Sequence, residues 1–256
     1  MESSDRICEF FSSISQEYSP LNVDDLPDRV KSKLSTDPCN HPPLPDHTVF
    51  ECLKKGKKTS SVPGDLPVKL LDEFLPELTA PVAAIYREAR AAHSWPGSYK
   101  KEYHIPINKI PCPQSEDDIR NLGLTTFFSK RLEWLLIQWI WPYISPHIDV
   151  YQVGGHPCCS VNHNLVLMLD FIQGKLDASS SNPTAVLAGL VDFNKAFNRM
   201  DHNIIITILS DLTVPTCALK LIISYLSNSK MCVRYNGATS MTKRSLVLAH
   251  KVAFSL

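Results

Sequence analysis

The stretch LVDFNKAFNRMDH (residues 190–202) decides how the rest of the chain is interpreted. It continues the run AVLAGLVDF (residues 185–193), which is too short for a typical helix and rich in Val and Leu, so it predicts a central buried strand. That strand would end on Asp192. Because desolvating a carboxylate is costly, Asp192 is expected at the mouth of a site and not inside the core. The alternative is a carboxylate that caps a helix or pairs with Lys195.

The composition suits a folded protein, because 44% of the 256 residues are hydrophobic and 20% are charged. The 26 basic residues balance the 26 acidic ones, which does not favour a nucleic-acid binder but leaves room for a local basic groove. The cysteines form no C-x-x-C pair, and we therefore expect reduced thiols in an intracellular protein of the cytoplasm or nucleus. The most apolar stretch, residues 132–144, is too short to span a bilayer, so no membrane anchor is expected.

Changes in composition divide the chain into three segments. Residues 1–60 are rich in Ser, Asp and Pro with little periodicity, which predicts a weakly ordered N-terminal lead-in. Residues 61–240 carry regular helical and strand patterns and are expected to form the folded domain. Residues 241–256 are interpreted as a divergent tail.

The first half of the folded domain predicts helices and one hairpin. Residues 65–78 and 79–95 have helical spacing, with Thr79 as the expected cap of the second helix. KEYHIPINKI (residues 101–110) and IRNLGLT (residues 119–125) predict two strands of a hairpin with a long loop. Ser129 is then expected to cap a helix that ends near Ile144.

The second half predicts three more helices and a second hairpin. Residues 160–177 form a helix whose expected apolar side consists of Leu165, Leu167, Met168 and Phe171. Two helices follow, at residues 201–212 with an Asp cap and at residues 215–228. KMCVRYNGATS (residues 230–240) predicts a hairpin that turns at Asn236 and Gly237.

Several stretches resemble the reverse transcriptase of non-LTR (LINE-like) retrotransposons. LVDFNKAFNRMDH is similar to the first catalytic motif, D-F-S-K-A-F-D followed by V-D-H. DIRNLGLTTFFSKRLEW (residues 118–134) is similar to D-x-R-P-I-S-L-T followed by S-K-x-x-E, and QVGGHPCCSVNH (residues 152–163) to Q-x-G-G-x-x-G-x-S-x-x-H. With the further pieces at residues 58–74, 94–110 and 215–237, the match covers roughly residues 57–240 in the order of the family.

The resemblance implies an α+β fold, with a helical fingers region and a partial palm of a right-hand polymerase whose sheet is incomplete. Asp192 matches the first catalytic aspartate, a ligand for Mg²⁺, and the backbone carbonyl of Phe193 matches a secondary ligand. Phe197 matches the ring that screens the sugar at its 2′ position. A core aromatic remains the alternative for Phe197.

The same resemblance assigns nucleotide-binding roles to two cations. Lys109 and Arg120 match the family's triphosphate contacts, one as a point charge and the other as a planar fork. The alternatives are a solvated strand end for Lys109 and an ion pair with Asp117 or Asp118 for Arg120. The implied activity is RNA-directed DNA polymerisation, with Mg²⁺, dNTPs, an RNA template and a primer strand as cofactor and partners.

Departures from the family argue against catalysis. The P-Q-G motif and the later pair of adjacent aspartates are absent after Asp192, Asn198 stands where the family has Asp, and Asn121 replaces a proline. One carboxylate cannot hold two metal ions, so we expect a catalytically inactive fragment that does not bind Mg²⁺ productively. Two alternatives stay open: an active polymerase, if this sequence is incomplete, and a module that binds nucleic acid or protein.

Overall fold

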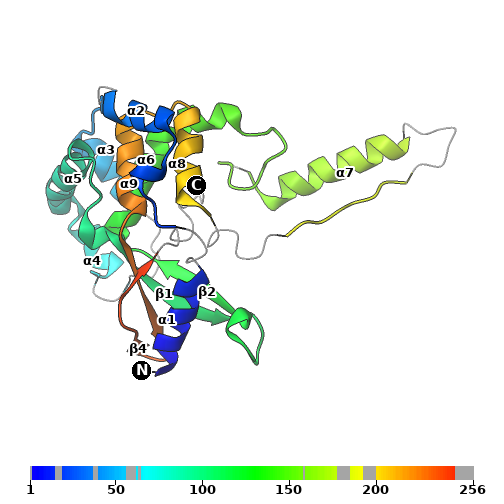
Figure 1. The fold of residues 1–256 in the computed structure, drawn as a ribbon, viewed down its shortest axis with the longest axis horizontal. Coiled ribbons are helices and arrows are strands. Elements are labelled where there is room, and N and C mark those ends of the chain that lie inside the picture. Colours follow the sequence, from blue (N-terminus) through cyan, green and yellow to red (C-terminus); the bar gives the residue numbers. More distant parts are fainter. Residues whose placement is uncertain are drawn as a thin grey trace.

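The computed structural model describes residues 2–14, 19–36, 40–55, 62, 65–157, 159–177, 185–192 and 200–245. Most helices gather into one body, and the strands form a small sheet at one end of it (Figure 1). This separation of helices from strands confirms the expected α+β class.

The helical body has one hydrophobic core. Its helices are α2 (Asp28–Thr36), α3 (Asp46–Lys54), α4 (Val68–Glu73), α5 (Leu75–Ala91), α6 (Phe127–Ile144), α8 (His202–Asp211) and α9 (Thr216–Leu226). Short 3₁₀ turns occur at Val23–Asp25, Gly97–Lys100, Glu116–Asp118 and Ser145–His147. Trp95 lies at the centre of the core, with its ring 4.6 Å from that of Tyr225 on α9. Tyr86 and Leu132 are also fully buried, so α5, α6 and α9 share this core.

Two predicted helix caps are wrong. Helix α5 begins at Leu75, with a proline in its first turn, and the Thr79 hydroxyl donates a 2.7 Å hydrogen bond to the Leu75 carbonyl inside the helix. The α6 cap is Thr126, whose side-chain oxygen accepts from the Ser129 N–H at 3.3 Å. Thr126 lies three residues before the expected cap, Ser129, so the helix begins three residues earlier than predicted, at Phe127.

The sheet is mixed, and both predicted hairpins are confirmed. Strands β1 (Lys101–Asn108) and β2 (Ile119–Leu124) pair antiparallel, as do β3 (Ser229–Tyr235) and β4 (Ala238–Thr239). Strand β1 also pairs in parallel with β3, which brings the two hairpins into one sheet. Strand β5 (Lys243–Ser245) adds to β3 antiparallel.

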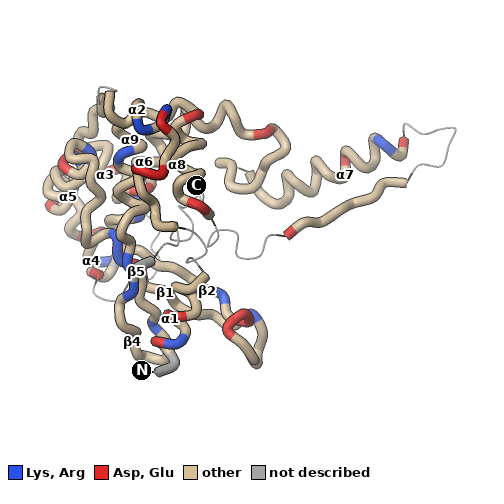
Figure 2. Tube along the Cα trace, in the orientation of Figure 1, with Lys and Arg blue, Asp and Glu red and all other residues tan. Residues whose placement is uncertain are grey.

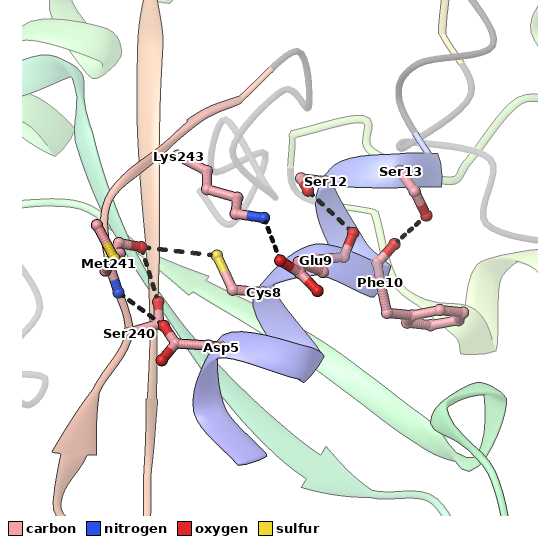
Figure 3. A network of polar contacts seen from close by, with 9 residues as sticks. All are labelled: Asp5, Cys8, Glu9, Phe10, Ser12, Ser13, Ser240, Met241 and Lys243. Atoms are coloured by element: carbon pink, nitrogen blue, oxygen red, sulfur yellow. Dashed lines mark hydrogen bonds and ion pairs between the residues drawn. The ribbon is translucent and has the colours of Figure 1, made fainter. Parts of the chain in front are cut away.

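Helix α1 (Glu2–Ile14) covers one face of this sheet. Ile7, Cys8 and Phe11 are buried against Met231 and Val233 of β3. Polar contacts hold the helix at its edge (Figure 3): the Met241 N–H donates to Asp5 Oδ1 at 2.9 Å, and Lys243 Nζ to Glu9 Oε1 at 2.9 Å.

The weakly ordered lead-in predicted for residues 1–60 is therefore wrong for the described part of that segment. Helices α1, α2 and α3 lie there, and Val30 and Val49 have no exposed surface. Arg29 of α2 forms a bidentate ion pair with Asp211 at the end of α8, with contacts of 2.9 and 3.1 Å. The polar composition of the segment reflects exposed helix faces and connections.

The central strand predicted at residues 185–193 is also wrong where the structure describes it. Residues 185–192 are extended but pair with no described strand, and Leu187 and Leu190 are 98% and 96% exposed. Like helix α7 (Val161–Asp177), the segment projects away from the helical body (Figure 1). An apolar run becomes a central strand only when other strands flank it, and none of the described strands does.

Candidate functional site

The tip of the β1–β2 hairpin holds Lys109 in a fixed place. Its N–H donates to the Asp118 carbonyl at 2.7 Å, one step beyond the last paired residues of the two strands, and its Nζ contacts the Asp117 carbonyl. Asp118 in turn accepts from the N–H groups of Gln114 and Ser115, and these hydrogen bonds hold the pKa of its carboxyl below the usual value. Lys109 is thus part of an ordered turn and not only a solvated strand end.

Arg120 lies on the same face of the hairpin as Lys109. It is opposite Ile107, two residues before Lys109, and side chains two positions apart on a strand share a face. Arg120 is exposed and has no ion-pair partner in the part of the chain that the structure describes. The hairpin therefore brings together the two cations that the family resemblance assigns to triphosphate binding.

The face of the sheet opposite α1 continues this positive surface. From the three adjacent strands it carries Lys101, Arg120, Lys230 and Arg234, which we call the basic face. Its other side chains from β1 to β3 are Tyr103, Ile105, Ile107, Leu122, Leu124 and Cys232, so none of the residues that these strands place there is acidic. Lys101 Nζ lies 4.9 Å from the Tyr103 ring centroid, a cation–π contact.

Acidic residues lie at one end of this surface. They cluster at the hairpin tip, at Glu116, Asp117 and Asp118 (Figure 2). Glu116 forms an ion pair of 2.7 Å with Arg6 of α1, on the other face of the sheet.

Asp192 lies at the end of the exposed segment 185–192, and the other two predicted palm residues, Phe193 and Phe197, lie outside the described residues. In the described part of the chain, no contact connects Asp192 with Lys109 or with Arg120. Among the described residues, no three of the His, Cys, Asp and Glu side chains form a group that could hold a metal ion.

The sequence interpretation missed a buried acid in the core. Glu133, the last residue of the S-K-x-x-E stretch, has a side-chain oxygen 2.9 Å from the Ser129 hydroxyl, which lies 3.1 Å from the Tyr99 carbonyl. Burial raises the pKa of Glu133 to about 7, with Ser129 and Lys130 lowering it and the charge of Glu102 raising it. Glu102 belongs to β1 and contacts His104 Nε2 at 3.1 Å, so this polar cluster links the sheet to α6. Ser129 and Glu133 are four residues apart, a spacing that brings two side chains together on a helix and that the sequence shows. The sequence does not show that Glu133 is buried.

Comparison with known proteins identified no relative. The chain matches no protein-family model and no curated protein. None of the helices in the described ranges is long and apolar enough to cross a membrane.

Proposed function

We propose that residues 61–240 are a reverse-transcriptase-like fragment, ancestrally an RNA-directed DNA polymerase, that binds nucleotide phosphates without polymerising them. The observation that supports this best is the shared face of Lys109 and Arg120. The two residues were assigned to one role from separate motifs, and the strand register brings them together. In this proposal the helices and the β1–β2 hairpin, which carries Lys109 and Arg120, belong to the fingers, and the segment that ends at Asp192 belongs to the partial palm.

In this proposal the chain does not catalyse polymerisation, and the reason is the environment of Asp192. Transfer of a nucleotidyl group by two metal ions needs several carboxylates around both ions. Asp192 is exposed, and among the described residues it belongs to no group of three or more His, Cys, Asp and Glu side chains that could hold a metal ion.

A second candidate function is the binding of a primer–template duplex, and the basic face favours it. Lys101, Arg120, Lys230 and Arg234 lie on three neighbouring strands with an aromatic ring and exposed aliphatic side chains between them. Cations on such a surface neutralise backbone phosphates, and the affinity then falls steeply with salt. This local surface exists although the chain as a whole is neutral.

The test is a titration of the full chain with a triphosphate and with an RNA–DNA primer–template, at low and at physiological salt. The variant Arg120→Gln is compared with Arg87→Gln, an exposed arginine on α5 that pairs with Asp46 at 2.6 Å and lies outside the sheet. We expect Arg120→Gln to weaken triphosphate binding at least several-fold and Arg87→Gln to leave it unchanged. Equal effects of the two substitutions on triphosphate affinity would show that Arg120 does not form a specific triphosphate site.

Primer extension with dNTPs and Mg²⁺ separates the alternatives. No extension by the folded chain is expected. Extension that requires Mg²⁺ and is lost in Asp192→Ala would overturn the non-catalytic proposal and establish a polymerase. Salt-dependent binding of the duplex, weakened by Lys230→Gln, would establish the second function.

A further inference from the structure

A small, partly open cavity lies in the helical body, between α5, α6, α9 and the segment of residues 42–48 that leads into α3. Its volume is about 160 Å³, and its walls are mostly apolar, including Leu44, Leu136, Trp139 and Leu221. A cavity of about 150 Å³ with such walls holds a molecule of the size of benzene. The space therefore suits one aromatic or branched aliphatic group.

Arg90 supplies a charge to these walls, and it is 8% exposed. Its Nη2 donates to the Pro42 carbonyl at 2.7 Å, and its guanidinium carbon lies 4.9 Å from the Trp139 ring centroid. Its Nε–H has no protein partner, and none of the described carboxylates pairs with it. Burial lowers the pKa of Arg90, and the neighbouring Cys217 thiol opposes that shift only in part. A buried guanidinium without an anion is costly unless a partner compensates it.

Two imidazoles neighbour Arg90, and neither of them supplies an anion. The rings of His41 and His93 stack with centroids 5.2 Å apart, and His41 lies 5.6 Å from Trp139. His41 Nδ1 and His93 Nε2 are buried and without a protein partner. Burial lowers the pKa of both, assisted by the Arg90 charge at His41 and the Lys220 charge at His93. The charges acting on this group are thus cationic.

We propose that the cavity binds a small carboxylate with a body of the size of benzene, whose ring fills the space beside Trp139 and whose carboxylate accepts from Arg90. The carboxylate supplies a negative charge beside Arg90, with which none of the described carboxylates pairs. The apolar walls select against inorganic phosphate and sulfate, which would leave most of their oxygens without donors. This site is distinct from Lys109 and Arg120, which lie on the sheet, so it stands or falls independently of the proposed function.

The test uses benzoate, and benzyl alcohol as a neutral molecule of the same size. Binding to the full chain is measured by calorimetry and by the shift of the Trp139 indole N–H in NMR spectra. We expect saturable binding of benzoate at least about ten-fold tighter than that of benzyl alcohol, because a hydrogen bond to a charged group contributes about 1.5–3 kcal/mol. In Arg90→Met the two affinities should become equal. In Arg29→Gln, an exposed arginine on α2 that does not line the cavity, the ten-fold preference should remain.

Three results would overturn the inference. They are equal affinities of the wild-type chain for benzoate and benzyl alcohol, a preference that survives in Arg90→Met, and no saturable binding of benzoate by protein that circular dichroism shows to be folded. The wild-type comparison alone decides the question if Arg90→Met fails to fold. Loss of triphosphate binding at Arg120 would leave these results unchanged.

Discussion

The side-chain oxygens of Ser129 and Glu133 lie 2.9 Å apart, one turn from each other on α6, in the buried region between the helices and the sheet. A serine hydroxyl has one proton, and here it has two acceptors within reach, Glu133 and the Tyr99 carbonyl. Ser129 can donate to only one of them at a time, so this hydrogen bond lowers the pKa of Glu133 only in part against the opposing effect of burial. The arrangement is consistent with the pKa of about 7 at Glu133.

The Glu133→Gln variant should change how stability depends on pH. The folded-state pKa of Glu133, about 7, is raised above the ordinary value of 4.5, so the folded state holds a proton that the unfolded state releases. Between pH 4.5 and 7 the wild-type free energy of unfolding should therefore fall as pH rises, by an amount on the order of 3 kcal/mol from this group. Glutamine does not titrate, so Glu133→Gln removes this contribution to the pH dependence of the free energy of unfolding.

Urea unfolding of both proteins at several pH values measures the effect. The difference between the two profiles isolates Glu133, because contributions from buried histidines such as His202 occur in both. We expect Glu133→Gln to gain stability relative to wild type as pH rises from 4.5 to 7 and the gain to level off above pH 7. A constant difference across this range would contradict the assignment.

The packing of α1 on the sheet predicts that the N-terminal helix contributes to global stability. Phe11 is 2% exposed and lies against β3, so Phe11→Ala should lower the free energy of unfolding by about 3–5 kcal/mol. Ser13, two residues on, is exposed and bonds only within its own helix turn, so Ser13→Ala should change stability by less than about 0.5 kcal/mol. Thermal unfolding compares them. Equal, small effects would mean that α1 does not fold with the sheet.

The exposure of α7 predicts unusual tolerance of polar substitutions at apolar positions. Leu169 is 60% exposed, so Leu169→Gln should leave the stability within about 0.5 kcal/mol of wild type. Leu132 on α6 is 1% exposed, so Leu132→Ala should lower the free energy of unfolding by about 2–5 kcal/mol. If Leu169→Gln were as harmful as Leu132→Ala, α7 would have to be buried in solution. Sedimentation of both proteins at several concentrations would then show whether a second copy covers it.

The hairpin turn at Gly237 predicts a backbone effect without any loss of contact. Its φ is +79°, a conformation that costs an alanine about 1 kcal/mol or more, although an added Cβ would meet no atom within 4 Å. Gly237→Ala should therefore destabilise the chain by about that amount. Gly97 has equal space and no positive φ, so Gly97→Ala is the control and should be close to neutral. Chemical denaturation of both variants makes the comparison, and equal values would rule out backbone strain.

Local chemistry explains which elements the sequence predicted well. The Asn-Gly turn of the second hairpin and the Asp201 cap of α8 are confirmed, with the Asp201 side chain accepting from the Asn203 N–H at 2.8 Å. Such features depend on neighbours in the chain. The first hairpin was predicted from two strand-like runs around a polar loop, and its register places Arg120 opposite Ile107, two residues before Lys109.

The errors occur where distant parts of the chain decide the outcome. The run at residues 185–192 has the composition of a buried strand, but burial requires partners from elsewhere. Helix α1 was overlooked although Ile7, Phe11 and Ile14 have helical spacing, because the Ser-rich and Asp-rich surroundings suggested disorder. The cavity beside Arg90 could not be predicted at all, since its walls come from separate helices.

The contact between Asp5 and Met241 has a consequence for how the protein is made. These two residues are 236 positions apart in the chain. At the usual pace of synthesis, roughly 5–20 residues per second, the first helix leaves the ribosome about 10–50 seconds before its docking strands exist. During that time Phe11 and its apolar neighbours have no native surface to cover them. Newly made chains should therefore depend on chaperones that shield exposed apolar helices, until the last strands of the sheet arrive.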